Sequence, residues 1–245
     1  MKGFLQDIDA AIIDLDGTLV DTLGDFVAAL ERMRADLSER GFVTSPLVAD
    51  QVIEMVGKGS ENLVKSALNH LNSLYAKANI ACGAINSEAN STFALARYLA
   101  HYEVISGQHA ALYPGVMDGL RACQAAGLPL ACVTNKPVAF ARPLLQHLGL
   151  GEFFSQVFGG DSFARKKPDP MPLLKTCEAL GTLPARTLMV GDSSNDAEAA
   201  RAAGCPVVLV TYGYNHGQPI RAVDADGWVD SLADLFELAA LTTPR

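Results

Sequence analysis

The sequence of 245 residues lacks several features, and each absence narrows the class of protein. It has no uninterrupted apolar run of about 18 residues, so no membrane-spanning helix is expected. Residues Met1–Asp7 lack the long apolar stretch of a signal peptide, which makes the cytoplasm the expected location. The five cysteines form no C-x-x-C pair, and their odd number favours reduced thiols over a disulfide framework.

A positive net charge, a block of like charges and an internal repeat are also missing. The formal net charge is −8, which argues against a nucleic-acid-binding surface. The composition, 49% hydrophobic and 19% charged, suits a globular protein of one large or two modest domains. A monomer or homodimer is expected. An acidic protein that handles an anionic substrate has to concentrate positive charge locally.

From about Tyr113 onward, short apolar strands alternate with helical patterns. Strands are predicted at residues 129–134, 187–191 and 206–211, with a short candidate at 157–158. Helices are predicted at residues 115–126, 138–148, 170–180 and 195–203. Because the strands are apolar throughout, they indicate a parallel sheet covered on both faces. The sequence therefore predicts a doubly wound α/β domain whose ligands bind beyond the carboxyl ends of the strands.

Residues 22–109 show a different pattern. Amphipathic helices are predicted at residues 23–37, 46–56, 61–75 and 90–104, and residues 76–91 are expected to form a loop. This block is too long for an ordinary crossover between two strands, so it is interpreted as an inserted helical domain. The predicted organisation is an α/β core of residues 1–21 and 110–245 with a helical insertion of residues 22–109.

The most informative motif is Asp14-Leu-Asp16-Gly-Thr18, directly after the apolar run Ala10–Ile13. Residues two apart on a strand point to the same side, so Asp14 and Asp16 face one space. Two carboxylates held this close repel each other, and a Mg²⁺ ion, which prefers oxygen ligands, removes the repulsion. The simpler alternative is an Asp-Gly turn after a strand.

Polar residues also follow the later strands. Thr134-Asn135 ends the second strand, Lys167 follows the third, and Asp192 and Asp196 follow the fourth. Each has an ordinary structural explanation: threonine often ends strands, Lys-Pro is a common loop pair, and Gly-Asp-Ser-Ser-Asn supplies N-cap residues. Because carboxyl ends of parallel strands share one edge, the set is expected to converge with the first aspartates.

This set, in this order, resembles the haloacid dehalogenase superfamily, specifically its aspartate-nucleophile phosphatases with a helical cap. The resemblance implies a Rossmann-like core in which Asp14 attacks phosphorus. It also implies that Asp16 acts as general acid and then base, with its main-chain carbonyl on Mg²⁺. A carboxylate at position 16 separates this chain from the dehalogenases of the superfamily.

The same resemblance assigns the remaining positions. Thr134, Asn135 and Lys167 are expected to hold the phosphoryl oxygens. Asp192 is expected to bind the metal, with Asp196 as a further ligand or a partner of its water shell. The partner is then a small phosphorylated metabolite, hydrolysed through an aspartyl-phosphate intermediate. The alternatives are a sugar-phosphate mutase that uses the same nucleophile, and a catalytically silent binding module.

Four segments resemble the bacterial phosphoglycolate phosphatases, which makes 2-phosphoglycolate the expected substrate. They are Leu19-Val-Asp21-Thr, Val56-Gly-Lys-Gly59 with Glu61-Asn-Leu-Val, Leu112-Tyr-Pro-Gly-Val116 and Tyr212-Gly-Tyr-Asn-His-Gly217. Within the second segment, Lys58 between Gly57 and Gly59 is the nearest cation in the insertion for the substrate's carboxylate. The alternative for these three residues is a flexible turn between helices that carries a solvated lysine.

Overall fold

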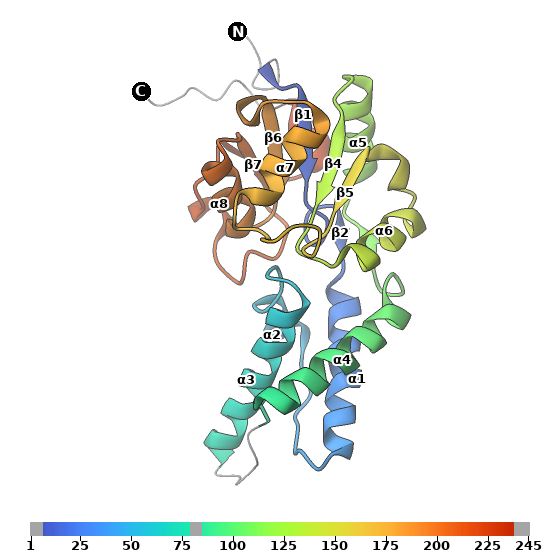
Figure 1. Ribbon diagram of the computed structural model, residues 1–245, viewed down its shortest axis with the longest axis vertical. Helices are drawn as coiled ribbons and strands as arrows, with labels where there is room; N and C mark the ends of the chain where they lie inside the picture. Colours follow the sequence, from blue (N-terminus) through green and yellow to red (C-terminus); the bar gives the residue numbers. More distant parts are fainter. Residues whose placement is uncertain (1–6, 79–84, 238–245) are drawn as a thin grey trace. The chain divides into compact units, whose positions relative to one another are not determined.

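The computed structural model describes residues 7–78 and 85–237 (Figure 1). The chain divides into two compact units, one of residues 1–21 and 111–245 and the other of residues 22–110. The first unit is an α/β domain and the second is helical.

The α/β unit contains a six-stranded sheet in which every pair of neighbouring strands is parallel. Its order across the sheet is β5 (Gln156–Phe158), β4 (Leu130–Val133), β1 (Ala10–Ile13), β6 (Thr187–Gly191), β7 (Val207–Val210) and β8 (Gly227–Val229). The predicted α/β fold with a parallel sheet is confirmed. Strand β8 was not predicted, because it is short and begins with Gly227, a residue type that is depleted in strands.

The strands are apolar throughout because both faces of the sheet are covered. On one face, Ile12 and Met189 pack with residues of α7 (Met171–Leu180) and α8 (Ser194–Ala203). The alternate residue Ile13 is equally buried, so the opposite face is shielded from water as well. The remaining long helices of this unit, α5 (Val116–Ala125) and α6 (Val138–His147), also form where the sequence predicts them.

A second, two-stranded sheet lies where the chain leaves the α/β unit and where it returns. Strand β2 (Val20–Asp21) pairs antiparallel with β3 (Ala111–Leu112). Neither strand was predicted, because each has two residues and depends on a partner about 90 positions away in the sequence for its hydrogen bonds. This ladder holds together the two points at which the chain crosses between the units.

The helical unit consists of α1 (Leu23–Glu39), α2 (Ala49–Ile53), α3 (Ser60–Ala78) and α4 (Glu88–Ile105). Helix α2 is shorter at both ends than the predicted helix at residues 46–56, since it starts at Ala49 and ends at Ile53. At its start, the Gln51 side chain accepts a hydrogen bond from the Val48 N–H at 3.1 Å. Among the described residues, no helix combines the length and the apolar character needed to cross a membrane.

The predicted loop at residues 76–91 is wrong at both ends. Helix α3 continues to Ala78, and α4 already begins at Glu88. The Ser87 side chain starts α4 by accepting a hydrogen bond from the Asn90 N–H at 3.4 Å. The small and polar composition concealed these helix ends. Residues 79–84, the middle of the predicted loop, lie outside the described residues.

A buried carboxylate ties the first helix of this unit to the end of its last helix. Asp25 is fully buried in the first turn of α1 and accepts hydrogen bonds from the N–H groups of Gly107 (2.7 Å) and His109 (2.8 Å). Beside it, the Phe26 ring stacks on Tyr102 of α4, with 5.6 Å between the ring centroids. Asp25 therefore satisfies backbone donors of the segment that follows α4.

We expect Asp25→Ala to lower the free energy of unfolding by about 2–4 kcal/mol, because two hydrogen bonds to a charged group are lost. Urea denaturation followed by circular dichroism measures this change. Asp118→Ala is the matched control, since the Asp118 side chain is 75% exposed and lies 3.8 Å from Arg121. It should change the free energy by less than about 0.5 kcal/mol. Equal effects in the two variants would contradict the structural role of Asp25.

Candidate active site

The site begins at the carboxyl end of the central strand. The Asp14 N–H donates to the Val190 carbonyl at 3.0 Å, which continues the pairing of β1 with β6 for one residue. Gly17 then has a φ of +88°, a conformation that side chains rarely adopt. A Cβ at this position would lie 2.3 Å from Asp192 Oδ2. Glycine is therefore required for the first loop to approach the fourth strand end.

Lys167 connects the separate strand ends. Its side chain is 2% exposed, and its ammonium lies 2.7 Å from the Val133 carbonyl, 2.7 Å from Asp196 Oδ1 and 3.0 Å from Asp14 Oδ1. Burial alone lowers the pKa of Lys167, but the carboxylates of Asp14 and Asp196 outweigh burial and raise it above its ordinary value. The lysine is thus held in its charged form, and it supplies the local positive charge that an acidic protein needs.

Three carboxylates gather around this point. Asp14, Asp192 and Asp196 each place one oxygen so that the three oxygens lie within 4.8 Å of one another. Asp192 is held from two sides: the Thr18 hydroxyl donates to Oδ1 at 2.8 Å, and the Tyr214 N–H donates to Oδ2 at 2.7 Å. The expected convergence of these strand ends is present in the structure.

The environment of the three carboxylates suits a cation. Asp14 Oδ1 is buried and accepts no hydrogen bond, since Lys167 meets it at ion-pair distance but outside hydrogen-bond geometry. Burial raises the pKa of Asp14 to about 7 and, together with the Asp196 and Asp14 carboxylates, raises the pKa of Asp192 well above its ordinary range. An ion with a preference for oxygen ligands would relieve both effects.

Thr134 and Asn135 lie beside Lys167. Thr134 is 3% exposed, and its hydroxyl oxygen accepts a hydrogen bond from the Lys136 N–H at 3.2 Å. The Asn135 side-chain amide donates to the Lys167 carbonyl at 2.9 Å, so it supports the backbone of that lysine. Phosphate binding by these two residues stays a prediction.

Two other predictions concern Asp16 and the turn of the helical unit. The Asp16 carboxylate is not one of the three clustered groups, and it pairs with Lys136 at 2.8 Å. Its predicted metal contact runs through the main-chain carbonyl. Lys58 is exposed on the turn between α2 and α3, where Gly57 and Gly59 both have a positive φ. Its predicted part in substrate specificity stays a prediction.

Sequence reasoning assigned no role to three residues that the structure places in the site. Thr18 lies within the first motif and Tyr214 within the segment 212–217, so the sequence analysis had singled out both segments. Their hydrogen bonds to Asp192 could not be predicted from these motifs. Lys136 follows Asn135 directly, and no local pattern distinguishes it from a surface lysine. Its partner Asp16 lies 120 positions earlier in the sequence.

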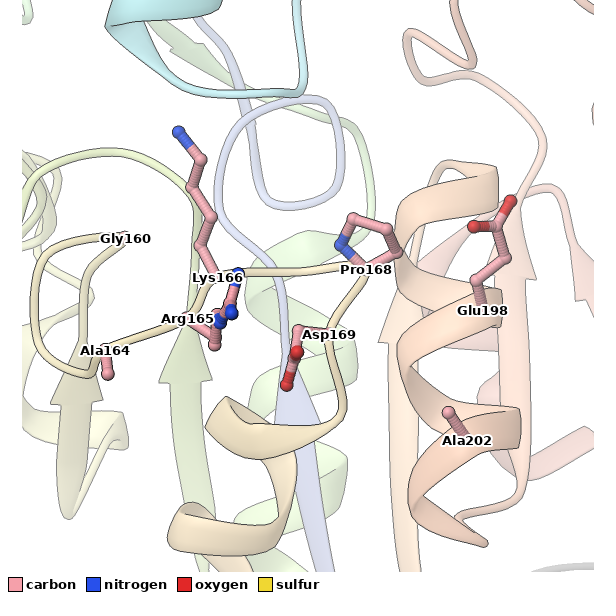
Figure 2. A pocket seen from close by; sticks show the side chains of 8 residues that line it. All are labelled: Gly160, Ala164, Arg165, Lys166, Pro168, Asp169, Glu198 and Ala202. Atoms are coloured by element: carbon pink, nitrogen blue, oxygen red, sulfur yellow. The ribbon is translucent and has the colours of Figure 1, made fainter.

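The lysine that precedes Lys167 points elsewhere. Lys166 is half-buried and lines a surface hollow together with Arg165, Pro168 and Glu198 (Figure 2). Figure 2 shows the Lys166 side chain extending from its loop away from the strands. The Lys167 ammonium, in contrast, lies 2.7 Å from Asp196 Oδ1. Of the two adjacent lysines, only Lys167 contacts the clustered carboxylates.

A model of the haloacid dehalogenase-like hydrolases matches residues 8–204. The chain belongs to this family. The hydrolase is 41% identical to a phosphoglycolate phosphatase of Thiobacillus denitrificans over 96% of each chain. It is 43% identical to a phosphoglycolate phosphatase of Nitrosospira multiformis over 94% of this chain and 95% of that protein.

A solved structure agrees with these relatives. The crystal structure of a predicted phosphoglycolate phosphatase from Haemophilus somnus superposes with a TM-score of 0.85 at 31% identity, covering 95% of this chain and 98% of that one. The hydrolase is therefore an enzyme that groups with the phosphatases of its family, and it has the fold that the sequence indicates.

We expect Thr18→Val to lower the free energy of unfolding of this hydrolase by about 1–3 kcal/mol, because it removes a hydrogen bond to a buried carboxylate without a large change in volume. Urea denaturation measures the change. Thr92→Val is the matched control, since the Thr92 hydroxyl donates only to the Glu88 carbonyl on an exposed helix surface. A loss no larger than that of the control would show that Asp192 does not depend on Thr18.

Proposed function

We propose that the protein is a Mg²⁺-dependent phosphomonoesterase that hydrolyses 2-phosphoglycolate to glycolate and phosphate. The observation that carries this proposal is the ammonium of Lys167 between Asp14 and Asp196, with Asp192 completing a cluster of carboxylates at one sheet edge. The names of the relatives support the substrate. The α/β unit is proposed as the catalytic core and the helical unit as the cap.

The residues of the site fit the proposed cation. Asp14, Asp192 and Asp196 would hold Mg²⁺ with carboxylate oxygens, and Asp16 would add its main-chain carbonyl. The bound ion would neutralise negative charge between the nucleophile and the phosphoryl oxygens. With Asp16, the four carboxylates carry a formal charge of −4, and the ammonium groups of Lys136 and Lys167, which pair with three of them, carry +2. The difference of −2 matches one divalent cation.

The proposed reaction has two steps. In the first, Asp14 attacks phosphorus to form an aspartyl-phosphate, and Asp16 donates a proton to the departing glycolate oxygen. In the second, Asp16 takes a proton from the water that attacks the aspartyl-phosphate, which returns Asp14 and releases phosphate. Proton transfer of this kind contributes about 10²–10⁴-fold to a rate. Lys167 and Thr134 are proposed to bind the phosphoryl oxygens, on which negative charge builds up.

The proposal extends to partners and location. Lys58 is proposed to meet the substrate's carboxylate, and a small metabolite is the proposed partner of a monomer or homodimer. The cytoplasm remains the proposed compartment. Its support is that the cysteines within the described residues, which are Cys123, Cys132, Cys177 and Cys205, are buried and form no disulfide.

A panel of phosphate esters tests the function. Purified protein is incubated with 2-phosphoglycolate, a sugar 1-phosphate or p-nitrophenyl phosphate, with Mg²⁺ or with EDTA, and the products are identified by ³¹P NMR. We expect free phosphate, the highest kcat/KM for 2-phosphoglycolate, and no turnover in EDTA. An isomerised sugar phosphate without free phosphate would favour the mutase. No reaction with any ester would favour a binding module.

The nucleophile is tested by Asp14→Asn. We expect phosphate release from 2-phosphoglycolate to fall more than about a thousandfold, because an amide cannot form the aspartyl-phosphate. The matched control is Asp224→Asn, since the side chain of Asp224 is 82% exposed on the surface and pairs with Arg201. The control should keep full activity. Substantial turnover by a folded Asp14→Asn variant contradicts the assignment of the nucleophile.

A further inference from the structure

A second buried lysine lies in the site. The Lys136 side chain is 3% exposed, and its ammonium donates a hydrogen bond to Asp16 Oδ1 at 2.8 Å. Lysine is almost never buried unless its charge is paired. Among the lysine side chains that the structure describes, only Lys136 and Lys167 are buried, and both contact the acidic residues that follow β1.

The backbone of Lys136 is fixed from two directions. Its N–H donates to the Thr134 hydroxyl oxygen at 3.2 Å, and its carbonyl accepts from the Gly160 N–H at 2.9 Å. Gly160 approaches so closely that a Cβ there would lie 2.4 Å from the Asn135 carbonyl oxygen. The loops after β4 and β5 are therefore locked together, and the base of the Lys136 side chain has a defined position.

Resting on the proposed function, we propose that Lys136 is a positioning residue for proton transfer by Asp16. Its ammonium holds the Asp16 carboxylate in one orientation. Asp16 lies on a tight turn and its side chain is 11% exposed, so water does little to weaken the ion pair. Misplacing a reacting group by about 1 Å can cost about 10²-fold in rate. Loss of Lys136 should therefore slow the proton transfer that Asp16 carries out.

The burial of Lys136 argues against direct recognition of the substrate. A lysine that binds the carboxylate of 2-phosphoglycolate has to present its ammonium to that group, whereas the Lys136 ammonium is engaged by Asp16. Lys167 is a different case, because it contacts Asp14 and Asp196 rather than Asp16. The two buried lysines therefore serve different carboxylates.

Three substrates test the role of Lys136 with the holoenzyme in Mg²⁺. These are 2-phosphoglycolate, ethyl phosphate, which has a poor leaving group but no carboxylate, and p-nitrophenyl phosphate, whose leaving group departs without a proton. In Lys136→Met we expect kcat/KM to fall about ten- to a hundredfold for the first two esters. For p-nitrophenyl phosphate the loss should be less than about threefold, because general acid catalysis contributes little there.

Two further variants support the comparison. Lys175→Met is the matched control, since the Lys175 side chain is 49% exposed and pairs only with Glu178 on α7. Lys175→Met should leave kcat/KM unchanged for all three esters. Lys136→Arg keeps the charge, so its kcat/KM should fall less than that of Lys136→Met. The loss should again be larger for 2-phosphoglycolate and ethyl phosphate than for p-nitrophenyl phosphate. If Lys136→Met does not fold, as judged by circular dichroism, the arginine variant alone decides through this order.

A double-variant cycle shows whether Lys136 acts through Asp16. In the Asp16→Asn background, Lys136→Met should cause no further loss in kcat/KM for ethyl phosphate, because the group that it positions is gone. A full additional loss in that background overturns the proposal. Mg²⁺ binding, measured by calorimetry, should be the same in Lys136→Met and the wild type.

The remaining outcomes separate the possible errors. An equal loss on all three esters overturns the proposal in favour of general attraction of phosphate. A rise in KM for 2-phosphoglycolate alone overturns it in favour of carboxylate recognition. An active wild type with an unchanged Lys136→Met contradicts only this inference. A wild type that hydrolyses none of the esters contradicts the proposed function, and this inference with it.

Discussion

The structure of the site depends on placing a buried ammonium among carboxylates that would otherwise repel one another. Lys167 reaches Asp14, Asp196 and the Val133 carbonyl from a single point. Transferring a charged group from water into the protein interior costs free energy. Such burial is tolerated only where opposite charges and hydrogen bonds surround the group. This requirement fixes the relative positions of three strand ends and the loop before α7. It also leaves an excess of negative charge that a metal ion can balance.

Close packing of backbone segments makes the small site possible. Gly17 allows the first loop to approach Asp192, and Gly160 brings the loop after β5 against Asn135. The last segment, around Tyr214, completes this arrangement: its N–H binds Asp192, and its hydroxyl donates to Asp21 at 2.6 Å. Asp21 belongs to the two-stranded ladder at the border of the α/β unit. Tyr214 thus connects Asp192, a candidate metal ligand, with strand β2, after which the chain leaves the α/β unit.

Much of the fold could be predicted because its signals are local. The runs Ala10–Ile13 and Thr187–Gly191 are apolar in every position, which indicates buried parallel strands whatever their partners are. The two residues of β2 are too few for a pattern, and β8 is short and begins with a glycine. The small and polar residues near position 80 favoured a loop longer than the one that the ends of α3 and α4 allow.

The sequence by itself determined the central strand, the acidic residues at strand ends and their order along the chain, since each depends on neighbours a few residues away. Only the tertiary structure decided which charges meet. Lys136 and Asp16 are 120 positions apart, and Thr18 and Asp192 are 174 apart. The energy of such a pair depends on distance and burial, and both are set by the packing of the whole sheet.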